Sequence, residues 1–336
     1  MKYKADHSHL DGDIISEVEK MLRCRDPTHG FLTYSCPQCG ELKTVPLACK
    51  SRICTSCGKK HADQWADNLA QTLYSVPHRH MVFTIPEQLR QPLQDDHKLL
   101  KVLMDAVSHT MKQMIKTRRK AVPGVICVLH PYGKDLTLNP HVHVLATEGG
   151  LTKQGEWIPV TFLEYRKLRR IWQYKLLTAL KKQMPKTWEN TRLIDSLFKN
   201  NPEGFYIYAK RRVTNPRKTA RYIGRYVRHP AIAESRITEF NPETNTVTFW
   251  YQRNGAKATV TMPAQEFIDR LVKLIPDKNM KLIRYYGLYA RRTRNKLQKI
   301  LTPLSRQKTK KQPKKDPIKC PKCGSTMQLI AITKPS

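Results

Sequence analysis

Paired cysteines constrain the fold of this chain more than any other feature. Cys36-Pro-Gln-Cys39-Gly and Cys54-Thr-Ser-Cys57-Gly are two Cys-x-x-Cys knuckles, each followed by glycine and separated by fourteen residues. No export signal is recognised, so this spacing is typical of zinc ligation rather than of disulfides. The pattern predicts that these four cysteines close one tetrahedral zinc site in a zinc ribbon.

Other cysteines are not assigned by this pattern. Cys24 and Cys49 are left over near the ribbon, and His29 and His61 are close to them in sequence. The two cysteines either bind a second zinc ion, with the histidines as further candidate ligands, or are buried thiols. Near the C-terminus, Cys320-Pro-Lys-Cys323-Gly has the form of half a ribbon. No partner pair follows it, so whether Cys320 and Cys323 bind metal is open.

The segment Pro140-His141-Val142-His143-Val144-Leu145 has the alternation of a β-strand. Successive side chains of a strand point to opposite faces, so His141 and His143 project from one face while Val142 and Val144 enter a core. Two imidazoles side by side on a rigid strand are half of a metal site. Two histidines on the surface of a strand are the structural alternative.

A third ligand is expected on the neighbouring strand. Residues 125–130 form an apolar run, and a Pro-Tyr-Gly turn leads back toward residue 141, which predicts a hairpin with His130 beside His141. Three ligands would leave open positions for water and phosphate oxygens. His80, or a residue further along the chain, is the rival for this third position.

A short helix is predicted between Pro216 and Pro230. Tyr222 and Tyr226 are four residues apart, so they share one face of that helix. Three arginines flank them and are suited to phosphate: Arg221, Arg225 and Arg228. A phenol is a poor nucleophile unless the target is polarised, which a divalent ion held by the histidines would do. The alternative is that both tyrosines pack the helix on a sheet.

The net charge of this chain indicates a polyanionic partner. The formal charge is +34, from 61 basic and 27 acidic residues, which makes nucleic acid the first expectation and an acidic membrane surface the competing one. No apolar stretch is long enough to span a membrane, so we expect a cytoplasmic, DNA-associated protein. Further arginines predicted to contact DNA lie near the end of the chain: Arg284, Arg291 and Arg292.

Taken in order, these motifs resemble the IS91 family of rolling-circle transposases, which belong to the HUH (His–hydrophobic–His) endonucleases. The shared motifs run from the zinc ribbon through Phe83-Thr-Ile-Pro86, Asn139-Pro-His-Val-His143 and Tyr222-x-x-x-Tyr226 to Ile283-Arg-Tyr-Tyr-Gly287. The resemblance implies an α+β fold in which the ribbon precedes a palm-like antiparallel sheet with flanking helices. It also implies magnesium or manganese on His141 and His143, and Tyr222 and Tyr226 as nucleophiles that cut single-stranded DNA and stay attached to its 5′ phosphate.

On this basis we expect four regions. They are a zinc-ribbon DNA-binding domain (1–60), the HUH nuclease domain (61–301), a basic linker (302–319) and a Cys-x-x-Cys tail (320–336). The leading hypothesis is a transposase that cleaves and rejoins single-stranded DNA at insertion-sequence ends. A rolling-circle replication initiator with the same chemistry and a non-catalytic zinc-ribbon DNA-binding protein are the alternatives, and a zinc hydrolase that cuts with water is less favoured. The sequence does not indicate the oligomeric state, the DNA sequences or the separate roles of the two tyrosines.

Overall fold

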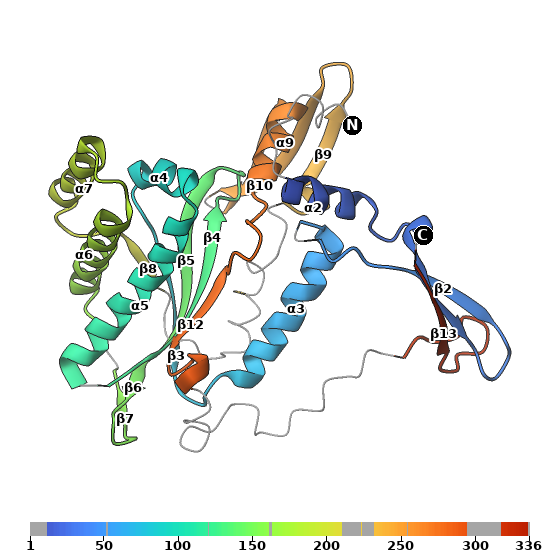
Figure 1. Cartoon of the computed structure of the whole chain (residues 1–336), viewed down its shortest axis with the longest axis horizontal. Helices are drawn as coiled ribbons and strands as arrows, with labels where there is room; N and C mark the ends of the chain where they lie inside the picture. The colour runs from blue at the N-terminus through green and yellow to red at the C-terminus, as the bar shows by residue number, and fades with distance from the viewer. Residues whose placement is uncertain are drawn as a thin grey trace.

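A five-stranded antiparallel sheet is the centre of the molecule (Figure 1). The computed structural model describes residues 12–51, 53–119, 121–160, 163–209, 223, 232–253, 255–293 and 317–334. The strand order is β12-β4-β5-β3-β8, and each neighbouring pair is antiparallel. The strands are β3 (His78–Phe83), β4 (Gly124–Tyr132), β5 (Leu138–Thr147), β8 (Ile207–Ala209) and β12 (Ile283–Gly287).

Helices cover one face of this sheet and enclose the main core. They are α4 (Arg90–Asp95), which follows the 3-10 turn η2 (Glu87–Leu89), and α5 (Lys98–Arg119), α6 (Tyr165–Gln183) and α7 (Trp188–Asn200). Val142 and Val144 of β5 are fully buried in this core, as their alternation with the histidines predicts. Trp172 of α6 packs edge-on against Phe83 of β3, with ring centroids 5.2 Å apart. The sheet is therefore fixed from behind by large apolar side chains.

The opposite face of the sheet carries the histidines and is covered by α3 (Thr55–Thr72) (Figure 1). Leu69 of α3 and the following Leu73 belong to a second apolar cluster with Val128 and Leu145 of the sheet. Trp65 Nε1 donates a hydrogen bond of 3.2 Å to Tyr285 Oη on β12. The same cluster contains Ile223, which is 1 % exposed.

Two smaller β units accompany the central sheet. One is a three-stranded sheet, β11-β10-β9, that packs with a helix around Phe249 and Phe267. Its elements are the 3-10 turn η3 (Glu234–Arg236), β9 (Ile237–Asn241), β10 (Thr246–Arg253), β11 (Ala256–Pro263) and α9 (Ala264–Lys273). The other is the hairpin of β6 (Gly149–Leu151) and β7 (Trp157–Pro159). Within the first unit, β10 and β11 pair antiparallel along their whole length, from Thr246↔Pro263 to Arg253↔Ala256.

The two ends of the described chain meet in a third sheet that stands away from the central one (Figure 1). After α2 (Gly12–Leu22) and the 3-10 turn η1 (Pro27–His29), the strands β1 (Phe31–Ser35) and β2 (Leu42–Pro46) form a hairpin. The C-terminal strand β13 (Gln328–Thr333) pairs antiparallel with the other edge of β1. The predicted α+β class with antiparallel sheets is confirmed, and residues 317–334 share a sheet with the N-terminal ribbon. The domain boundaries themselves stay predictions.

Candidate active site and metal centres

Three histidines converge on the face of the central sheet that α3 covers. His130 on β4 lies directly opposite His141 on β5, and Val128 lies opposite His143, so all three side chains leave the sheet on one face. His130 Nδ1 and His141 Nε2 are 3.0 Å apart, and the rings of His141 and His143 have centroids 5.1 Å apart. One ring nitrogen of each residue lies within 4.8 Å of the others. The hairpin thus brings the expected third histidine beside the other two.

Neighbouring groups orient two of these rings. His141 Nδ1 donates to the backbone carbonyl of Asn139 at 2.6 Å, which leaves Nε2 as its ligand atom. His143 Nδ1 lies 3.1 Å from Nε2 of His80 on β3, and the two rings stack with centroids 5.4 Å apart. Histidines that bind metals are commonly oriented by such bonds at their second nitrogen. His80, the rival for the third position, therefore lies behind His143.

Burial keeps these imidazoles in the form that binds a metal. Loss of solvation, together with the nearby His141 ring, lowers the pKa of His130 to about 3. Burial also lowers the pKa of His141, against the opposing effect of its bond to the Asn139 carbonyl. Neutral imidazole is the ligand form, so the pair needs no deprotonation to bind a cation at neutral pH. The donor set fits a divalent ion with three protein ligands and further positions open to oxygen atoms.

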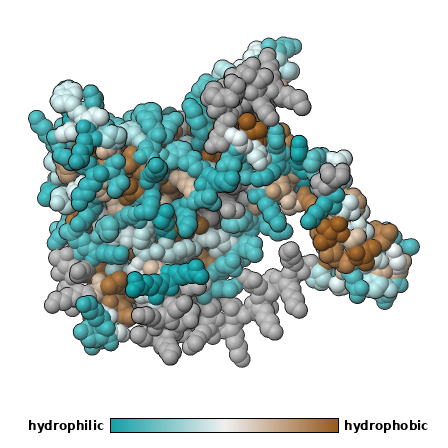
Figure 2. All heavy atoms as spheres, in the orientation of Figure 1, coloured by the Kyte–Doolittle hydropathy of each residue, from teal (hydrophilic) through white to brown (hydrophobic). Residues whose placement is uncertain are grey.

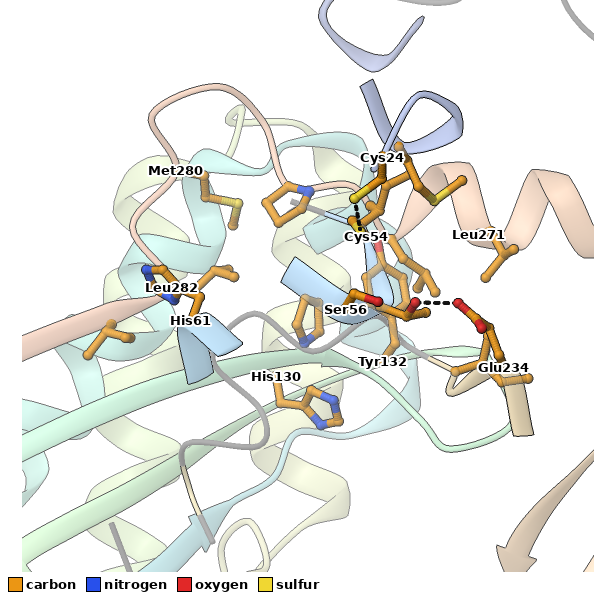
Figure 3. Close-up of a pocket in the computed structure, with 18 of the residues that line it drawn as sticks. Cys24, Cys54, Ser56, His61, His130, Tyr132, Glu234, Leu271, Met280 and Leu282 are labelled. Carbon is orange, nitrogen blue, oxygen red and sulfur yellow. Dashed lines mark hydrogen bonds between the residues drawn. The ribbon is translucent and has the colours of Figure 1, made fainter. Parts of the chain in front are cut away.

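A cavity of about 710 Å³ opens beside His130 (Figure 3). Its walls come from the N-terminal part of the chain, from the end of β4 and from residues 232–237 and 271–283. Cys24 and Cys54 line one part of it and His130 another, and His61 of α3 lines it as well. Thr55 donates a hydrogen bond to Glu234, and both residues line the cavity. The cavity therefore connects a cysteine cluster to the histidines.

The first cysteine cluster lies at the N-terminus of α3. It contains Cys24, Cys49, Cys54 and Cys57, whose sulfur atoms are 3.5 Å (Cys24–Cys54), 3.7 Å (Cys49–Cys57) and 3.8 Å (Cys24–Cys57) apart. Tetrahedral zinc with Zn–S bonds of about 2.3 Å separates its sulfurs by about 3.8 Å, so the spacing fits zinc. Cys54 precedes α3 and Cys57 is in its first turn, so the start of this helix carries two of the four sulfurs.

The second cysteine cluster joins distant parts of the chain. Cys36 and Cys39, between β1 and β2, meet Cys320 and Cys323, with sulfur distances of 3.5 Å (Cys36–Cys323) and 3.6 Å (Cys39–Cys320). The prediction that one site holds Cys36, Cys39, Cys54 and Cys57 is therefore wrong in its grouping. Each knuckle is present, but the two belong to different clusters because β13 brings a third knuckle alongside the first. Cys24 and Cys49 complete the cluster that contains the second knuckle, Cys54 and Cys57.

The remaining predicted residues are placed differently. The tyrosines and their flanking arginines lie outside the described residues: Tyr222, Tyr226, Arg221, Arg225 and Arg228. Arg284 pairs in register with the buried Cys127, so it projects from the face of the sheet that α5 covers, away from the histidines. Arg291 and Arg292 are exposed beyond the end of β12 that is remote from Val128. The structure thus does not bring these three arginines to the histidines.

His80 is the residue near this site whose place sequence reasoning missed. The sequence makes it a rival for the third ligand position, whereas the structure places its Nε2 against Nδ1 of His143. The alternation His78-Arg-His80 before an apolar run indicates that His78 and His80 share one face of a sheet. The sequence does not indicate that this strand is the neighbour of β5, so it does not place His80 beside His143.

Two family models match this chain. One, described as "Putative transposase", matches residues 124–296, and the other, described as "Transposase zinc-binding domain" of the IS91 type, matches residues 1–85. The chain is 31 % identical over 344 aligned residues to the transposase for insertion sequence element IS801 of Pseudomonas savastanoi pv. phaseolicola, covering 94 % of this chain and 83 % of that one. It is 26 % identical to "Putative transposase y4qJ" of Sinorhizobium fredii, covering 87 % and 78 % respectively. No solved structure matches it.

The fold, the cysteine clusters and these matches define a transposase with a zinc-binding N-terminal domain. It belongs to the IS91 family of insertion-sequence transposases. Zinc binding by the N-terminal cysteines agrees with their sulfur spacing. Among the described residues, no helix has the length and apolar character needed to cross a membrane.

Proposed function

We propose that this transposase cleaves and rejoins single-stranded DNA at insertion-sequence ends through a covalent 5′-phosphotyrosine. The observation that carries the proposal is the convergence of His130, His141 and His143 on one face of the sheet. Ile223 supports it further, because this residue follows Tyr222 directly in the chain and is buried in the apolar cluster on the histidine face. Tyr222 and Tyr226 are the proposed nucleophiles.

The proposed reaction exchanges one phosphoester for another. The tyrosine Oη attacks phosphorus, the Oη–P bond forms, and the P–O3′ bond breaks, while the phenolic proton passes to solvent and the 3′ oxygen leaves as a hydroxyl. Attack of a 3′ hydroxyl on the phosphotyrosine reverses these steps and rejoins a strand, so no ATP is needed. When bound, magnesium or manganese would polarise the phosphodiester. The histidines hold and orient that ion, and His80 fixes the ring of His143.

Basic residues supply the proposed contacts to the DNA backbone. Arg221, Arg225 and Arg228 flank the tyrosines in sequence and are assigned to phosphates at the cleavage site. Arg291 and Arg292 are exposed beyond the C-terminal end of β12, and we assign them to phosphates further from the cleavage site. Arg284 lies on the face of the sheet that α5 covers, away from the histidines, and is the weakest of the predicted DNA contacts.

The test mixes the purified protein with single-stranded DNA from the ends of its own flanking element, with magnesium or manganese, and analyses the denatured sample on a gel. We expect a metal-dependent protein–DNA adduct that is absent in the Tyr222→Phe/Tyr226→Phe double variant and in His141→Ala. Tyr174→Phe is the matched control, because Tyr174 is an exposed tyrosine of α6 behind the sheet. The two single tyrosine variants apportion the roles.

The alternatives give different results in the same assay. Cleavage without an adduct would identify a metal hydrolase that uses water, and tight binding without cleavage would identify a non-catalytic DNA-binding protein. A replication initiator would form the same adduct but would act on a nicking site next to a replication origin. Joining of the cleaved element end to a second, unrelated DNA strand distinguishes transposition from initiation.

A further inference from the structure

Four cysteines from opposite ends of the chain form a site that neither family model covers as a unit. The models match residues 1–85 and 124–296, whereas Cys320 and Cys323 lie beyond both. We propose that Cys36, Cys39, Cys320 and Cys323 bind a structural zinc ion, which fastens residues 317–334 to the N-terminal ribbon. This proposal is independent of the nuclease reaction.

The two knuckles have the same backbone geometry. The amide of Gly40 donates to the carbonyl of Cys36 at 2.9 Å, and the amide of Gly324 donates to that of Cys320 at 3.0 Å. Both glycines have positive φ, +71° and +73°, a conformation that other residues rarely adopt. A turn of this kind points the amides and both sulfurs of a knuckle toward one centre, as in zinc ribbons. The C-terminal pair is therefore built as a metal knuckle and not as two incidental cysteines.

The positions of the four sulfur atoms fit a shared metal ion and do not fit disulfide bonds. The distances of 3.5 and 3.6 Å across the cluster are close to the value of about 3.8 Å expected around tetrahedral zinc. A disulfide would need about 2.05 Å, and all four residues are free cysteines. Cys36 and Cys320 are buried, at 1 % and 3 % exposed, so two of the four thiols are shielded from solvent.

Apolar burial gives this sheet little stability of its own. Its core contains the buried Cys36, Cys320 and Met327, with a few partly buried neighbours. All six residues of β13 are exposed, and three of its aliphatic side chains are about half exposed: Leu329, Ile330 and Ile332. In Figure 2 apolar side chains gather on the surface of this unit. Many comparable small units fold only when structural zinc is bound, so the ion is the main candidate for holding β13 in place.

The consequence is a change in chain topology. Coordination of Cys36 and Cys39 with Cys320 and Cys323 closes the intervening chain, histidines and predicted tyrosines included, into one ring. Loss of the ion would open the ring without breaking a covalent bond of the backbone.

The test uses the full-length chain with a site-specific protease sequence inserted in segment 302–316. Zinc is counted by elemental analysis, and after cleavage the C-terminal fragment is followed by gel filtration and mass spectrometry. We expect the Cys320→Ser/Cys323→Ser variant to bind one zinc ion fewer per chain than the parent. After cleavage, its C-terminal fragment should separate from the rest of the chain on gel filtration. Lys322→Ser is the matched control, because Lys322 lies exposed between the two ligands and should keep both the ion and the fragment.

A second arm does not depend on the folding of a variant. The cleaved parent chain is treated with a chelator, which should release the fragment, and zinc is then restored, which should recover co-elution. An unchanged zinc count in Cys320→Ser/Cys323→Ser would overturn the proposal. A fragment that stays bound without metal, or that leaves while the zinc count is unchanged, would also overturn it.

Discussion

Replacing His80 tests whether the histidine cluster binds a metal with the proposed geometry. His80 Nε2 lies 3.1 Å from His143 Nδ1, and both residues are buried, so His80→Phe removes the bond that orients His143 while keeping a ring of similar size. Loss of such a supporting partner usually weakens metal binding about 10- to 100-fold, or about 1.4–2.7 kcal/mol. We therefore expect the manganese concentration for half-maximal adduct formation to rise by that factor.

The assay measures adduct formation over a manganese titration, alongside direct metal binding and thermal unfolding. Excess manganese should restore most of the activity of His80→Phe, because His80 orients a ligand and does not react. His109→Phe is the matched control, since His109 is exposed on α5, which packs on the other face of the sheet. An unchanged titration midpoint would refute the role of His80, and a loss that no metal concentration restores would show that the substitution damages more than metal affinity.

Three further predictions follow from single contacts. Burial lowers the pKa of His78 to about 4, whereas the unfolded chain binds this proton near pH 6.5, so the free energy of unfolding falls as the pH drops from 6.5 toward 4. In urea unfolding, His78→Gln should reduce the loss of unfolding free energy between pH 7.5 and 5 by about 2 kcal/mol. An identical pH dependence in the variant and the parent would contradict this. Gly287 has φ +59°, and an added Cβ would lie 1.8 Å from the Pro123 carbonyl oxygen, so Gly287→Ala should lower the free energy of unfolding by more than about 2 kcal/mol. Gly255 has φ +86° but open space around it, so Gly255→Ala should lower it by about 1 kcal/mol. Equal shifts in the thermal unfolding of the two variants would argue against the clash at Gly287. Tyr286 Oη donates to Asp105 at 2.7 Å, so Tyr286→Phe should cost about 1–2 kcal/mol in the same measurement, and no change would mean that water replaces the bond.

The histidine hairpin was readable from the sequence because its signals are local. Alternation of period two fixes which side chains share a face, and the short turn between two apolar runs fixes which strands are neighbours. Together these place His130 opposite His141, as the register of β4 and β5 has it. The position of His80 was not readable in this way, because β3 joins β5 across more than fifty residues of intervening chain.

The grouping of the cysteines shows where local reasoning ends. Spacing identifies each knuckle, but knuckles of equal spacing are chemically interchangeable, so the sequence does not say which two share an ion. Strand pairing decides it here: β13 adds to β1 and brings together Cys39 and Cys320, which are 281 residues apart.

The position of the first cysteine cluster connects zinc binding to the nuclease face. Cys54 and Cys57 lie at the start of α3, and Leu69 near its end belongs to the apolar cluster that contains Val128, the register partner of His143. Cys24 and Cys54 line the same cavity as His130. Because a helix is stiff along its length, the ion that sets its first turn also sets how its apolar face meets the sheet. We therefore expect zinc at this cluster to support the geometry of the histidine site.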